Sequence, residues 1–152
     1  MQSFLFGAIN TENIGRELDA QPAQYDLIFR HYYGAAFSSI SRLSTEAEPK
    51  YFKPFLSALK AGRGTEASEI ERRWLAETKN AAAIFGALNP FWNTAEFETM
   101  LTHFIKLLCQ SAENDMLGKY QKIGNSFLVL DRLAGDLGEY MAVGIIRQFH
   151  VE

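Results

Sequence analysis

The chain has 152 residues, of which 47% are hydrophobic and 22% charged, and its net charge is −3. This length suits one domain around a single core, and the composition excludes a disordered chain. The small negative charge gives no cationic field for a polyanion, so we expect no nucleic-acid partner. No apolar run approaches the roughly 20 residues that a membrane-spanning helix needs, and no basic segment precedes the apolar start. We therefore predict a cytoplasmic protein that does not contact the membrane.

Apolar residues recur at intervals of three and four along the chain, which predicts an all-α fold. Residues 1–21 are expected to form an N-terminal extension or a short helix. A second helix should run from Pro22 to about Arg42 with one buried apolar face. A third follows Pro49, with Pro54 near its start, and the glycines at 62 and 64 offer a left-handed residue for its end.

The second half of the chain predicts three longer helices. The first covers residues 66–87 and ends at Asn89-Pro90. Asn93 with Glu96 three residues later is a capping-box pattern that begins the next helix, which should fray at residues 111–115. The last runs from about 117 to 149. Its glycines lower helix propensity, so we expect them to permit close helix packing. The predicted buried face of this helix contains Ile123, Phe127, Leu130, Leu133, Leu137, Tyr140, Met141, Ile145 and Ile146.

The sequence carries few patterns that indicate chemistry. His31, His103 and His150 lie far apart and none follows a glutamate by three residues, so we expect no metal site. Cys109 sits beside two leucines, which is typical of an inert core thiol. The run Glu71-Arg72-Arg73-Trp74 is interpreted as a solvated helix face rather than a contact patch. With no phosphate-binding loop and no paired carboxylates on an apolar face, the sequence predicts no enzyme.

Several short segments, taken in order, resemble a known family. Residues 29–33 look like a B helix with a distal tyrosine, residues 43–46 like the entry to an E helix, and residues 55–62 like its glycine-terminated end. Residues 85–92 are similar to the glycine and proline run before a G helix, and residues 128–133 with Tyr140 to an H helix. Together they resemble the globin domains of bacterial globin-coupled sensors and the related protoglobins.

The resemblance implies a globin-like fold of about six to seven helices, with residues 1–152 as a single sensor domain. The position of the proximal histidine falls on Ala83 or Ile84, and neither side chain can bind iron. We therefore expect a haem-free domain without a cofactor. The alternative is a haem-binding sensor of oxygen or another gas, with Lys79 or His103 as a non-standard axial ligand. The residues expected to line the pocket, or to fill it, are Tyr32, Tyr33, Phe37, Phe55, Ile84, Phe85 and Trp92.

The same resemblance implies how such a domain would act. We expect a sensory or regulatory domain that signals through helix packing, forms a homodimer through its last two helices, and passes the signal to an output domain or a protein partner. The chain end after the last helix suits a complete small protein or a sensor cut from its output module. An unrelated helical protein-interaction module, such as an immunity or anti-factor protein, is the alternative from another class.

Overall fold

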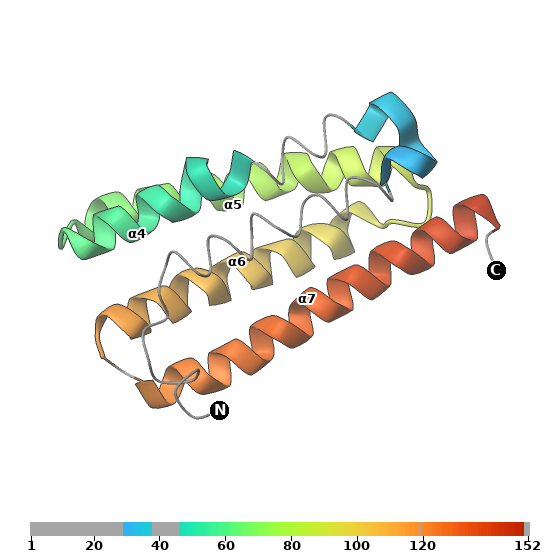
Figure 1. The fold of residues 1–152 in the computed structure, drawn as a ribbon. Helices are drawn as coiled ribbons and strands as arrows, with labels where there is room; N and C mark the ends of the chain where they lie inside the picture. Colours follow the sequence, from blue (N-terminus) through green and yellow to red (C-terminus); the bar gives the residue numbers. More distant parts are fainter. Residues whose placement is uncertain (1–28, 38–45, 119, 151–152) are drawn as a thin grey trace. The chain divides into compact units, whose positions relative to one another are not determined.

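The computed structural model describes residues 29–37, 46–118 and 120–150 (Figure 1). The chain divides into two compact units, Met1–Glu48 and Pro49–Glu152, and each is described here by itself. No strand occurs in the described ranges, so the all-α prediction is confirmed, although these ranges hold fewer helices than the six to seven expected. The extension predicted over residues 1–21 lies outside the described residues. The single domain and the globin-like topology stay predictions.

In the first unit, a short α-helical segment over residues 29–33 passes into the 3-10 helix η1, Gly34–Phe37. Gly34 has a φ of +55°, a left-handed conformation that glycine adopts without steric cost and that an α-helix cannot continue through. The prediction of one continuous helix to about Arg42 is therefore wrong at Gly34. Within the described part of this predicted helix, Phe29 is buried and Ala36 is exposed.

The second unit begins within the π-helix η2, Glu48–Phe52, which leads into α4, Lys53–Lys60. Pro54 lies in the first turn of α4, where a proline is tolerated. Because proline has no N–H to donate to the preceding turn, the helix departs from regular α geometry there. Phe55 and Ala58 of α4 are fully buried. Gly62 then takes the left-handed conformation, with a φ of +70°, which confirms the predicted helix end.

Helix α5, Gly64–Leu88, begins two residues earlier than predicted and packs against α4. Because only three residues join the two helices, they run antiparallel: Tyr51 stacks on Trp74 with ring centroids 5.8 Å apart, and Lys50 pairs with Glu77. Hydrogen bonding to Lys50, and then to Tyr51, lowers the pKa of the Glu77 carboxyl. These contacts hold the start of the second unit against the middle of α5.

Helices α6, Thr94–Met116, and α7, Tyr120–Phe149, complete the unit. Helix α6 packs on both α5 and α7 and lies between them (Figure 1). It continues through residues 111–115, where fraying was predicted. Helix α7 has 30 residues and is therefore roughly 45 Å long. Such a helix, packed along one side on α6, leaves its opposite side available to solvent.

Candidate functional site

The stretch between α5 and α6 is a compact helix end built around a buried asparagine. Asn89 is fully buried, and its extended backbone is the conformation that a following proline favours. Its main-chain N–H donates to the Phe85 carbonyl at 3.2 Å, and its side-chain oxygen accepts from the Phe91 N–H at 2.8 Å. The Asn89 main-chain N–H therefore satisfies a carbonyl at the end of α5, and its side-chain oxygen satisfies an N–H of the turn that follows.

Aromatic rings pack behind this turn. Phe85 stacks on Phe97 with centroids 4.5 Å apart and meets Trp92 edge-on at 5.7 Å. Tyr140 of α7 extends the cluster, with its ring 6.0 Å from that of Phe97. The rings come from α5, the connection, α6 and α7, so this aromatic cluster joins the helices of the second unit at one end.

Hydrogen bonds fix α7 to the same turn. The Trp92 Nε1–H donates to the Met141 carbonyl at 3.2 Å, and the Asn93 N–H donates to the Tyr140 hydroxyl oxygen at 2.7 Å. The Tyr140 hydroxyl in turn donates to the Glu96 carboxylate at 3.1 Å. Burial, with a smaller contribution from Glu96, raises the pKa of Tyr140, so the hydroxyl stays protonated as this donation requires. This part of the residues expected to line or fill a pocket is thus tied together by internal hydrogen bonds.

Two glycines allow this close packing. A Cβ placed on Gly144 of α7 would lie 2.0 Å from Trp92 Nε1, and one on Gly86 of α5 would lie 2.2 Å from the Thr94 hydroxyl oxygen. Only a residue without a side chain fits at either position. The prediction that glycines of the last helix permit close approach is confirmed at Gly144. It does not hold at Gly135 and Gly138, where an added Cβ would meet nothing within 4 Å.

The structure brings together only some of the residues predicted to line one pocket. Phe85 and Trp92 are in contact and buried, with Ile84 half-buried beside them. Phe55 is buried near the other end of α5: it lies one turn beyond Tyr51, which stacks on Trp74. Tyr32, Tyr33 and Phe37 belong to the first unit, where both tyrosines are half-buried. A pocket shared by all seven residues stays a prediction.

The residues considered for iron binding point away from the helix contacts. Ala83 is exposed and, like Ile84, has no donor atom. Lys79 and His103 are both exposed, and each directly follows a threonine of the Thr78–Thr102 contact between α5 and α6. None of these side chains is placed to serve as the axial ligand of a haem iron in the aromatic cluster. The absence of haem itself stays a prediction.

The remaining candidate side chains have structural surroundings. Cys109 is buried, and burial, with the Glu71 and Glu113 carboxylates as lesser causes, raises the pKa of its thiol to about 12. An inert core thiol was predicted, and this environment is typical of one. Among the described residues, no group of three or more His, Cys, Asp or Glu side chains is placed to hold a metal ion.

The charged run on α5 is a solvated face with internal pairing. Arg72 and Arg73 both donate to the Glu69 carboxylate, at 2.8 and 2.9 Å, and hydrogen bonding to Arg72, then Arg73, lowers the pKa of Glu69 to about 2. Trp74 instead faces inward and is buried against Tyr51. The solvated-face interpretation holds for Arg72 and Arg73, whereas Glu71 is half-buried, and the absence of a contact patch stays a prediction.

The outer side of α7 carries an apolar surface that the sequence pattern did not predict. Phe127 and Ile146 were predicted to be buried, but they are 60% and 50% exposed, and Leu128 is 70% exposed. The error arises because α7 has apolar residues on two sides, and periodicity alone does not show which side meets α6. The exposed residues at alternating steps of four and three form what we call the outer seam: Leu128, Arg132, Gly135, Glu139, Ala142, Ile146 and Phe149.

This spacing is the one that brings helices together side by side. Steps of four and three repeat every seven residues, and such a line of residues stays on one face of a helix that pairs with another. Every residue of the outer seam is exposed, although Phe149 at its end also has an interaction within the chain. A second surface feature near α7 is a shallow open groove between α6 and α7. It is lined by Ala95, Glu96, Thr99, Met100 and Tyr140.

Comparison with known proteins gives no relative. No family model matches the chain, and neither a curated protein nor a solved structure matches it. In the described residues, no helix is both long enough and apolar enough to cross a membrane. The fold and the surface of α7 therefore define the molecule only as an all-α protein with a partly apolar exposed face on α7.

Proposed function

We propose that this chain is a non-enzymatic regulatory module that acts through protein contacts made by the outer seam of α7. The observation that carries the proposal is the seam itself: a line of exposed residues on one face of α7, with large apolar side chains at both ends and two small and two charged residues between them. Exposing Leu128, Ile146 and Phe149 to water is unfavourable, and a partner helix would remove that apolar surface from water.

Hydrogen bonds hold the inward side of α7, opposite the outer seam, and so define which residues of the helix face solvent. Trp92, Asn93 and Gln148 connect α7 to the end of α5 and the start of α6 through hydrogen bonds of 3.2, 2.7 and 3.1 Å. Because these contacts fix which side of α7 faces inward, they also fix which side faces solvent. A binding surface on a helix held in this way needs little ordering when a partner binds.

Site-specific photocrosslinking tests the proposal. A benzophenone side chain placed at Leu128 or Ile146, in the native host, should give a discrete adduct of the same mass from both positions. The same group at the exposed Lys79 of α5 is the matched control and should give none. If the two seam positions give no adduct, or only the smear also obtained from Lys79, the outer seam is not a binding surface and the proposal is wrong.

A further inference from the structure

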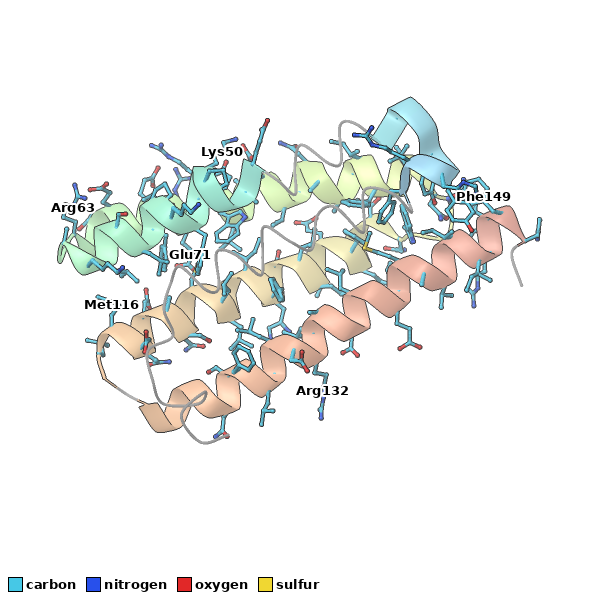
Figure 2. The ribbon with its side chains drawn as sticks, in the orientation of Figure 1. Lys50, Arg63, Glu71, Met116, Arg132 and Phe149 are labelled. Atoms are coloured by element: carbon cyan, nitrogen blue, oxygen red, sulfur yellow. The ribbon has the colours of Figure 1, made fainter. Side chains whose placement is uncertain are left out.

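The outer seam carries two exposed side chains of opposite charge, which restrict the kind of helix that it can bind. Arg132 and Glu139 are exposed and carry opposite charges on either side of Gly135. Neither has an ion-pair partner within the described ranges, whereas both arginines of the α5 face share Glu69. Figure 2 shows the Arg132 side chain directed away from α6. Both charges are therefore available to a second molecule.

We infer that the outer seam binds a second copy of this chain, with the two α7 helices antiparallel and crossing at Gly135. This inference rests on the proposed function and specifies its partner. Arg132 lies three residues before Gly135 and Glu139 four residues after it. Across a two-fold axis at Gly135, Arg132 of one copy therefore lies beside Glu139 of the other, and the pair occurs twice.

Size complementarity favours the same register. Leu128 lies seven residues before Gly135 and Ala142 seven residues after it, so the large side chain of one copy meets the small one of the other. At the axis, Gly135 meets Gly135. A Cβ added at this glycine would meet no atom within 4 Å, which leaves room for a second backbone. The register thus places large residues against small ones and opposite charges together.

The other simple arrangements bring like charges together. In a parallel pair, Arg132 meets Arg132 and Glu139 meets Glu139. In an antiparallel pair centred at Glu139, which would place Leu128 against Phe149, the two Glu139 carboxylates meet at the axis. Like charges across a helix pair are unfavourable, so the two Arg132–Glu139 contacts favour the register centred at Gly135, although the exposed Asp131 of one copy then lies level with Glu139 of the other.

Charge reversal tests this register in solution. By sedimentation velocity over a range of concentrations, the purified chain should form a dimer whose Kd rises with salt. Arg132→Glu or Glu139→Arg alone should each raise the Kd by about tenfold, because each converts two attractive pairs into repulsive ones. The double variant restores both pairs with the charges exchanged, and its Kd should return to within about threefold of the original.

Controls separate this result from loss of folding and from other partners. Lys79→Glu should leave the Kd unchanged, and circular dichroism should show equal helix content and equal thermal midpoints for all variants. A chain that stays monomeric at every concentration, or a double variant no better than the single ones, overturns the inferred register. If the photocrosslinked adduct has a mass other than twice that of the chain, the second copy is wrong while the proposed function stands.

Discussion

At the scale of single residues, glycine has two different roles in α7. Gly144 is required by contact, since Trp92 occupies the space where its side chain would be, whereas Gly138 faces open space. The sequence shows the same letter at both positions and predicts close packing for both. The difference depends on which side of the helix meets Trp92, a residue 52 positions earlier in the chain, and no local pattern encodes it.

The two glycines give a matched pair of substitutions. Gly144→Ala should lower the free energy of unfolding by about 1–3 kcal/mol, because the new methyl group displaces the indole and breaks its hydrogen bond to Met141. Gly138→Ala should raise it by up to about 1 kcal/mol, because alanine has the higher helix propensity. Urea denaturation at low protein concentration measures both. Equal effects of the two substitutions would contradict the contact assigned to Gly144.

At the scale of the elements, local sequence signals predicted the helix ends well. Asn93 accepts hydrogen bonds from the Ala95 and Glu96 N–H groups at 2.9 and 3.1 Å, as its position before α6 predicted. Gly62 ends α4 in the left-handed conformation, and Asn89 ends α5 before Pro90. These signals are local because each acts on main-chain groups within a few residues. The Glu96 carboxylate departs from the pattern, since Tyr140 of α7 donates to it.

The cap of α6 can be tested by substitution. Asn93→Ala should lower the free energy of unfolding by about 1 kcal/mol, because two first-turn N–H groups lose their acceptor. Asn93→Asp retains that acceptor and should have little effect. Asn80→Ala, an exposed position within α5, serves as the control for the loss of an asparagine side chain. A loss at position 80 as large as that at position 93 would show that capping is not the cause.

At the scale of the whole molecule, the sequence predicted the helical class and most of the long helices, but not the outer seam. Phe127 and Ile146 fit the predicted core face, and only the packing of α6 on α7 shows that they lie outside it. The two arginines beside Trp74 show the opposite case: their place beside a tryptophan on an amphipathic helix was enough to interpret them as solvated, and the structure adds their pairing with Glu69. Local pairing is visible in sequence, whereas the choice between two apolar sides of a helix is a tertiary property.

The haem-free prediction also belongs to this scale. Titration of the protein with haemin should give only the broad absorbance of weakly associated haem, because Ala83 offers no ligand and Lys79 and His103 are exposed. Lys79→Ala and His103→Ala should leave that spectrum unchanged. A sharp Soret band that disappears in either variant would establish haem binding through that side chain and would reverse the prediction.

The two tryptophans of the chain lie at separated points, Trp74 within α5 and Trp92 in the connection between α5 and α6. Trp74 stacks on Tyr51 beside the start of α4, and Trp92 donates its indole N–H to α7. Replacing either by phenylalanine leaves a single tryptophan, one that reports on the α4–α5 contact or one that reports on the attachment of α7. Equilibrium unfolding followed by emission from each variant can therefore show whether α7 detaches before α4 and α5 separate, or whether the second unit melts as one cooperative body.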